Sequence, residues 1–305
     1  MAWRLHLTNQ AIQRLDILPN TQSLLAIWLR QDRVVYHDLA SGVAVGEQTL
    51  EMFKAADRKS NTWHELLNEL VVPNGVYLPV VDAGYAVIYL TDDGQMRLYD
   101  YGNGELALEI EGKEIPLDID GQSPLAIALD RFLGLVAILD EDAKLRIFQQ
   151  HISVGVFDFG LERDAYLRPT IAISRGGSVI FCSDGKRIAV TDSGGKLLKM
   201  LETHHTIGQI ACSSSGRRVA TSDPDTGVIR VYDGNDLAAT HQRHAIDLMA
   251  DARQVQLMAE LPPAGVALRG LNIDDDGVIA FAMSGVVCVT DIHVMDELPR
   301  PQPLL

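Results

Sequence analysis

The sequence predicts an all-β fold made of repeated four-stranded antiparallel units. Three observations lead to this expectation: apolar, strand-like runs fill most of the 305 residues, Asp-Gly and Gly-rich turns separate them, and one short motif returns along the chain. Runs of this length, rich in Val, Ile and Tyr and broken by such turns, are typical of antiparallel meanders. Because 47% of the residues are hydrophobic, the chain can bury a substantial core.

The recurring motif is a strand of apolar residues that usually ends in Asp. Its copies are VVYHDLASG, MRLYDYGNG, LRIFQQ, RIAVTDSGG, IRVYDGND and VVCVTDI. The equivalent end positions are Asp38, Asp100, Gln149, Asp192, Asp233 and Asp291. Successive copies are separated by 62, 49, 43, 41 and 58 residues. A base period slightly above 40 residues is that of a four-stranded propeller blade, and we interpret the Asp as a turn-forming residue.

Two further strands precede each copy, and a fourth can follow it. The first ends in a small turn, as at residues 176–177, and the second ends in an acidic or Gly turn, as at residues 184–185. Segments 106–112 and 196–202 have the length and the apolar pattern of a fourth strand. We therefore predict a β-propeller with six blades preferred, and seven possible if an insertion hides a degenerate blade.

The two ends of the chain predict how the ring closes. Residues 2–8 form an alternating strand with no blade of their own, and the segment after the last copy is interrupted by prolines. We expect the N-terminal strand to complete the last blade, which removes open sheet edges. The chain is then a single propeller domain, residues 1–305, with short insertions at about 51–73 and 237–262.

The first insertion has the pattern of an amphipathic helix. Thr62 followed by Glu65 makes a capping box, and one helical face then carries Trp63, Leu66, Leu67 and Leu70. This face either packs on the rim of the propeller or binds a partner, and we take its four apolar residues as tentative partner-binding residues. The second insertion, 237–262, is a helix or an elongated hairpin, and the sequence does not separate the two.

The stretch from residue 201 to residue 234 resembles a WD40 repeat. The matching residues, in chain order, are His205, Gly216, Thr221 with Ser222, Asp225, and Tyr232 with Asp233. The other copies lack the His, and none contains a Trp-Asp pair, so the chain as a whole resembles a degenerate WD40-like propeller.

In the WD40 family a His, a Ser or Thr, an Asp and a Trp form a buried hydrogen-bond network within the blade. The resemblance assigns these roles to His205, Ser222, Asp225 and Tyr232, where Tyr stands in place of Trp; Thr221 remains an alternative to Ser222. We therefore expect His205 and Asp225 to brace a blade and not to form a catalytic pair.

Two other stretches of the sequence only weakly resemble metal-binding sites. Residues 272–277, NIDDDG, begin like a calcium loop, but position twelve, where an EF-hand needs Glu, is Met283. His241 and His244, with the pair at 204–205, lack a positioned acidic or Cys ligand for zinc. We expect no catalytic residue, no metal site and no cofactor.

The net charge limits the kinds of partner that we expect, and the cysteines indicate the cellular compartment. The formal net charge of −15 disfavours direct binding of nucleic acid or of an anionic membrane surface. The three cysteines form no C-x-x-C pair, and no secretory signal is evident, so we expect a cytoplasmic protein.

The sequence thus favours a non-catalytic scaffold or adaptor for other proteins. The alternative is a metal-dependent, hydrolase- or lactonase-like propeller, or a propeller that binds a small ligand in its central channel.

Overall fold

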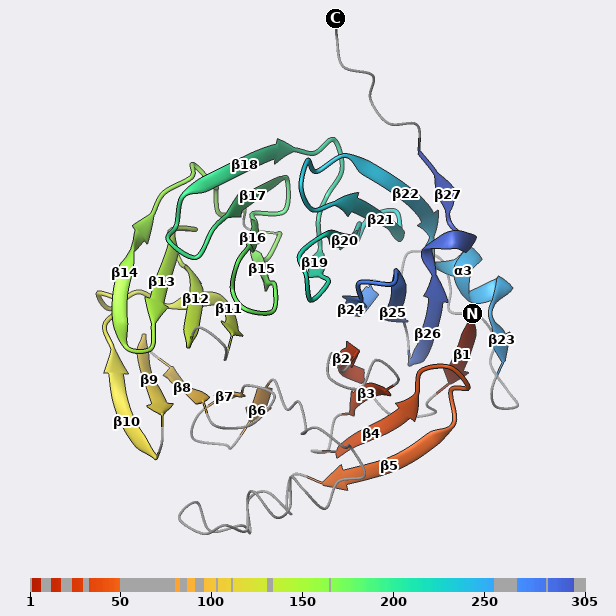
Figure 1. The fold of residues 1–305 in the computed structure, drawn as a ribbon, viewed down its shortest axis with the longest axis horizontal. Helices are drawn as coiled ribbons and strands as arrows, with labels where there is room; N and C mark the ends of the chain where they lie inside the picture. The colour runs from red at the N-terminus through yellow and green to blue at the C-terminus, as the bar shows by residue number, and fades with distance from the viewer. Residues whose placement is uncertain are drawn as a thin grey trace, which may run out of the picture.

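The computed structural model is an all-β ring of sheets. It describes residues 2–6, 12–17, 24–29, 33–49, 80–82, 87–90, 96–102, 104–110, 112–130, 134–164, 166–254, 268–283 and 285–298. Within these residues the strands form six sheets, which we call blades 1 to 6 and which stand around a common centre (Figure 1). The prediction of an all-β propeller is confirmed.

The first three blades follow one another along the chain. Blade 1 contains β2 (Ile12–Ile17), β3 (Leu24–Leu29), β4 (Arg33–Asp38) and β5 (Ala44–Thr49). Blade 2 contains β6 (Val80–Asp82), β7 (Val87–Leu90), β8 (Met96–Gly102), β9 (Glu105–Ile110) and β10 (Lys113–Leu117). Blade 3 contains β11 (Pro124–Asp130), β12 (Leu135–Asp140), β13 (Leu145–Gln149) and β14 (Ile152–Phe157).

Blade 4 again follows the chain order, whereas blades 5 and 6 include strands from distant parts of the chain. Blade 4 contains β15 (Thr170–Ile173), β16 (Ile180–Ser183), β17 (Arg187–Thr191) and β18 (Leu197–Glu202). Blade 5 contains β19 (Gln209–Cys212), β20 (Arg218–Ser222), β21 (Val228–Asp233), β22 (Ala239–His244) and β27 (Asp296–Glu297). Blade 6 contains β24 (Leu268–Ile273), β25 (Val278–Met283), β26 (Val286–Asp291), β1 (Trp3–His6) and β23 (Arg253–Gln254).

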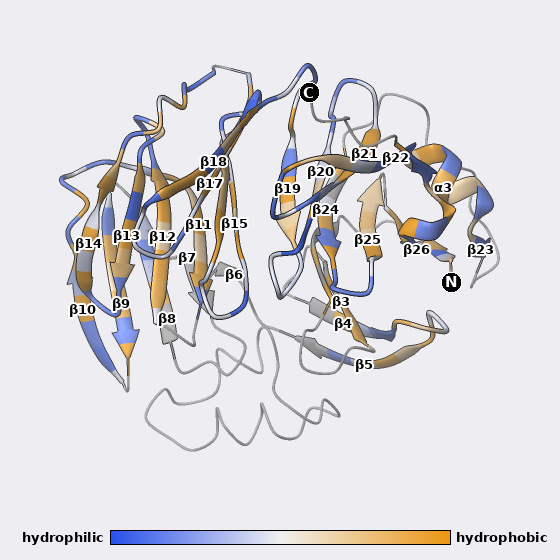
Figure 2. Ribbon diagram, turned by 45° about the horizontal axis from the view of Figure 1, so that its top comes forward, coloured by the Kyte–Doolittle hydropathy of each residue, from blue (hydrophilic) through white to orange (hydrophobic). Residues whose placement is uncertain are grey.

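Burial follows the position of a strand within its blade. All six residues of β12 are buried, because a middle strand packs against the neighbouring blade on both faces. The outer strand β14 is mostly exposed. Among the described residues, clusters of buried apolar side chains lie between blades 2 and 3, 3 and 4, 4 and 5, 5 and 6, and 6 and 1. In Figure 2 apolar residues predominate along the strands, and many of the polar residues lie in the loops and turns.

The N-terminal strand closes the ring, as predicted. In β1, residues 3–6 pair antiparallel with residues 286–289 of β26, and the two strands lie side by side in Figure 1. The other edge of β1 pairs with β23, and Arg253 N donates a hydrogen bond to Ala2 O. Trp3 is 1% exposed, and its Nε1 donates to Leu39 O of blade 1 at 2.7 Å. Strand β1 therefore joins the first blade to the last.

The described part of the second insertion contains a helix, and its first residues belong to blade 5. Its described part continues β22, forms α3 (Ala245–Asp251) and ends in β23. Leu248 and Met249 of α3 are buried in the core shared by blades 5 and 6. After β26 the chain forms a short 3-10 helix, η1 (Ile292–Val294), and β27, which adds an outer strand to blade 5. The first insertion, 51–73, lies outside the described residues.

Turns between the first two strands of successive blades hydrogen-bond to one another. Asp130 of blade 3 accepts from Gly176 N of blade 4 at 2.8 Å, and Arg175 N of blade 4 donates to Ser214 O of blade 5 at 2.8 Å. Ser215 N of blade 5 then donates to Asp275 of blade 6. These contacts fix blades 3, 4, 5 and 6 against one another near the centre of the ring.

Candidate interaction face

An Asp at the end of the second strand organises one end of each of blades 3, 4 and 5. In blade 3 this residue is Asp140, which is fully buried. Its Oδ1 accepts hydrogen bonds from the backbone N–H groups of Asp142 and Lys144 at 3.1 and 2.9 Å. Its Oδ2 accepts from Nε of Arg146, on the third strand, at 2.7 Å. One carboxylate thus shapes the turn and neutralises a buried arginine.

The arrangement repeats in the next two blades. Asp184 Oδ1 accepts from backbone groups in its turn, and its Oδ2 accepts from Arg187 Nε at 2.8 Å. Asp223 holds the corresponding turn of blade 5, with Arg230 at 3.5 Å. Burial raises the pKa of Asp184, but the backbone N–H groups of its turn and the Arg187 guanidinium outweigh it, so the pKa of this carboxyl is lowered.

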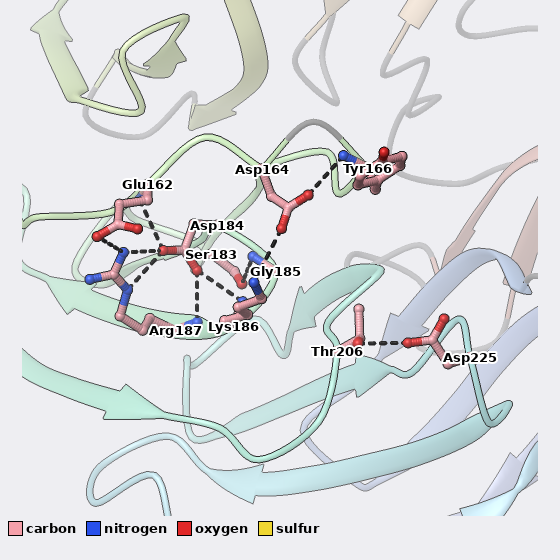
Figure 3. Close-up of polar contacts among 10 residues, drawn as sticks. All are labelled: Glu162, Asp164, Tyr166, Ser183, Asp184, Gly185, Lys186, Arg187, Thr206 and Asp225. Carbon is pink, nitrogen blue, oxygen red and sulfur yellow. Dashed lines mark hydrogen bonds and ion pairs between the residues drawn. The ribbon is translucent and has the colours of Figure 1, made fainter.

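The same arginines bind the loops that cross from the preceding blade. Arg146 Nη1 lies 2.6 Å from a carboxylate oxygen of Asp120, and Arg187 Nη2 lies 3.5 Å from one of Glu162. Glu162 N also donates to Asp184 at 3.0 Å (Figure 3). The loops that enter blades 3 and 4 are therefore fixed to the turns of those blades. Sequence reasoning missed this repeat; the available signal was the Arg that recurs at or near the start of the third strand in LRIFQQ, KRIAV and IRVYDG.

In blade 5 the crossover loop carries His205, and the structure brings this residue to Tyr232. Tyr232 OH lies 3.0 Å from His205 Nε2, and the two rings are stacked. Burial, with the nearby charge of Arg230, lowers the pKa of His205 to about 4. The neutral imidazole is the form that this position favours.

The structure does not bring Asp225 to His205. The Asp225 carboxylate accepts a hydrogen bond from Thr206 Oγ1 at 2.7 Å (Figure 3), and the buried acid of this turn is Asp223. The reason is geometric: Asp223 directly follows the buried second strand β20, whereas Asp225 lies at the exposed tip of the turn.

The register of blade 5 also separates the two hydroxyl candidates. Thr221 lies opposite Arg230, and Val219 lies opposite Tyr232, so Thr221 and Tyr232 share one face of the sheet. Ser222 is buried, but strand alternation places its side chain on the opposite face. The geometry therefore favours Thr221 over Ser222 as the neighbour of Tyr232.

The loop that crosses from blade 3 to blade 4 presents an exposed aromatic side chain. Tyr166 is 95% exposed. Asp164 holds the loop, because its Oδ1 accepts from Tyr166 N at 2.8 Å and its Oδ2 accepts from Lys186 Nζ at 3.2 Å (Figure 3). The crossover loops and the turns of blades 3 to 5 together form what we call the brace face.

The weak metal candidates do not converge. Asp274 Oδ1 accepts from Val278 N, whereas Asp275 accepts from Ser215, so the acids of NIDDDG serve the turn and the next blade. His244 Nδ1 lies 3.2 Å from the carbonyl of Thr226. Across the described parts of the chain, no three His, Cys, Asp or Glu residues lie together in a way that could hold a metal ion.

The tentative partner-binding residues Trp63, Leu66, Leu67 and Leu70 lie outside the described residues. Their role remains a prediction.

The comparisons with known proteins show the fold. No protein family profile matches the chain, and no curated protein sequence matches it. Among solved structures, the chain is similar to the β-propeller domain of Cps50 (Swd1) from Myceliophteria thermophila, with a TM-score of 0.62 and 10% sequence identity. The match covers 95% of this chain and 99% of that one. The chain therefore has the β-propeller fold.

Proposed function

We propose that this protein is a non-catalytic scaffold that binds other proteins through the brace face. The observation that carries this proposal is Tyr166, a large side chain that buries almost nothing in its own fold although hydrogen bonds hold its loop. Exposed Tyr is enriched among residues that dominate protein interfaces, and a fixed loop reduces the entropy lost on binding.

The acidic net charge of the chain also favours proteins over nucleic acids and membranes as its partners. A net charge of −15 opposes binding to phosphate backbones and to anionic membranes. Among the helices that the structure describes, none is long and apolar enough to span a membrane. The three cysteines are free thiols, which suits the reducing cytoplasm that we propose as the compartment.

Quantitative affinity capture from the native cells tests the proposal. We expect Tyr166→Ala to keep the stability of the wild type and to weaken capture of at least one specific partner by about 30-fold, the loss of a 2 kcal/mol anchor. Val294→Ala, which alters an exposed apolar side chain of η1, is the matched control and should change neither property. A partner set identical for Tyr166→Ala and wild type, or an empty set for wild type, would contradict the proposal.

A further inference from the structure

The outer edges of the blades are not equivalent. Blades 2, 5 and 6 carry a fifth strand at the outside. In the described part of the chain, blades 1, 3 and 4 end with β5, β14 and β18. An outermost strand presents a row of backbone N–H and C=O groups that can pair with another strand.

Among these three edges, β14 lacks the usual protection. Ile152, Val154 and Val156 are 63%, 40% and 46% exposed. The segment 149–157 contains no Asp, Glu, Lys or Arg, whereas β5 contains Glu47 and β18 contains a Lys and a Glu. Proteins ordinarily place charges or prolines on open edges to prevent strand addition. An apolar, uncharged edge is therefore a candidate binding surface.

Blade 5 shows how a strand adds to such an edge. Its fourth strand, β22, has one extra residue, Thr240, between the positions that pair with β21. Beyond this bulge β27 pairs antiparallel with His241 and Gln242, and Leu298 N donates to Thr240 O at 2.8 Å. The bulge thus leaves the outer edge able to accept a strand.

Strand β14 pairs with β13 through the same one-residue bulge that β22 has in its pairing with β21. Its extra residue is Val154, between Ser153 and Gly155, which pair with consecutive residues of β13. Val154, Gly155 and Val156 therefore correspond to the three β22 positions that receive the outer strand of blade 5. The backbone geometry that β27 uses recurs on β14.

We propose that the edge of β14 binds an extended segment of another protein, antiparallel to β14, with aliphatic residues at alternate positions and Lys or Arg at its ends. Backbone hydrogen bonds supply affinity, and aliphatic contacts with Val154 and Val156 supply specificity. The net charge of −15 attracts a basic segment and opposes a second copy of this chain. The proposal rests on the scaffold function and assigns it a second surface.

A designed peptide tests this edge directly. The probe alternates valine and threonine over six residues between two lysines at each end. Its binding to the full chain is measured by fluorescence anisotropy, and its position by hydrogen exchange of the backbone amides. We expect the peptide to slow exchange in residues 152–157, and Val154→Lys to weaken its binding at least 10-fold.

The matched control is Val45→Lys. Val45 is 44% exposed and is the extra residue of β5, between Ala44 and Gly46, so it occupies the same position in blade 1. We expect Val45→Lys to bind the peptide within twofold of the wild type. A peptide with alternate N-methylated amides should bind neither protein, because it cannot form the backbone ladder.

The outcomes distinguish this inference from the scaffold proposal. Absence of exchange protection in residues 152–157, or equal weakening by both lysine variants, would overturn the assignment to β14. A wild-type dimer in sedimentation that Val154→Lys converts to a monomer would overturn the choice of a different protein as the occupant. Tyr166→Ala should bind the peptide like the wild type, so loss of native partners in that variant with peptide binding intact reports on the brace face alone.

Discussion

Strand β1 is the element on which closure of the ring depends, and Trp3 is its main anchor. A buried Trp removes about 150–250 Å² from water, which at about 25 cal/mol per Å² corresponds to roughly 4–6 kcal/mol. Its indole N–H also satisfies Leu39 O across the boundary between blades 6 and 1. We therefore expect Trp3→Ala to lower the free energy of unfolding by about 4–6 kcal/mol.

Trp3→Phe separates the two contributions. Phe keeps most of the apolar contact and lacks the indole donor, so we expect a loss of only about 1–2 kcal/mol. Deleting residues 1–10 removes both Trp3 and the equally buried Leu5, and should destabilise the protein more than either single truncation. Since domains are stable by only about 5–15 kcal/mol, the deletion can leave the chain unfolded, and Trp3→Phe then provides the measurable step.

Urea unfolding followed by far-ultraviolet circular dichroism measures these losses without relying on Trp fluorescence. Val43→Ala, which truncates an exposed side chain, should remain within about 0.5 kcal/mol of the wild type. If Trp3→Ala unfolded at the same urea concentration as the wild type, β1 would not close the ring in solution and the reasoning would be refuted.

Three further predictions follow from the brace face and the first insertion. Asp140→Ala should cost about 3–5 kcal/mol, because it removes the buried partner of a buried arginine and leaves that arginine only the exposed Asp120, whereas Asp142→Ala, in an exposed pair, should change stability by less than about 1 kcal/mol; denaturant titration compares them. His205→Ala should cost about 1–3 kcal/mol at neutral pH. The pKa of His205, about 4 in the folded protein, is below its unfolded value, so the wild type should lose this stability as pH falls from about 6.5 to 4, and a steep acid dependence retained in His205→Ala would contradict this. If the first insertion binds a partner, Trp63→Ala should reduce partner capture with an unchanged melting temperature, whereas a loss of about 3–5 kcal/mol would place Trp63 in the core.

The sequence determined the repeat and its turns, because these depend on neighbours along the chain. The period of the motif indicated blades, and Asp residues after the third strands form turns as expected: Asp192 Oδ1 accepts from Gly194 N and Lys196 N, and Asp38 Oδ1 accepts from Ser41 N. The unmatched N-terminal strand was sufficient to predict closure, since a spare strand and an incomplete blade complement each other.

The pairing of His205 with Tyr232 was within reach of the sequence, but its acidic and hydroxyl neighbours were not. Asp223 and Asp225 differ by two residues in one turn, and Thr221 and Ser222 are adjacent. For the hydroxyls the strand register decides which side chain lies on the face of Tyr232, because adjacent residues of a strand point to opposite faces. For the acids the turn decides, because Asp223 directly follows the buried strand and Asp225 lies at the exposed tip.

The tertiary structure alone decided the features that join distant segments. The placement of β23 beside β1 and of β27 beside β22, the arginine braces between crossover loops and turns, and the open edge at β14 depend on which blade surfaces meet. Strand alternation and turn chemistry act over a few residues and are visible in the sequence. Pairing between edges that lie more than 50 residues apart, as in β22 and β27, is set by the packing of the whole ring, because only the closed ring brings those backbone groups within hydrogen-bonding distance.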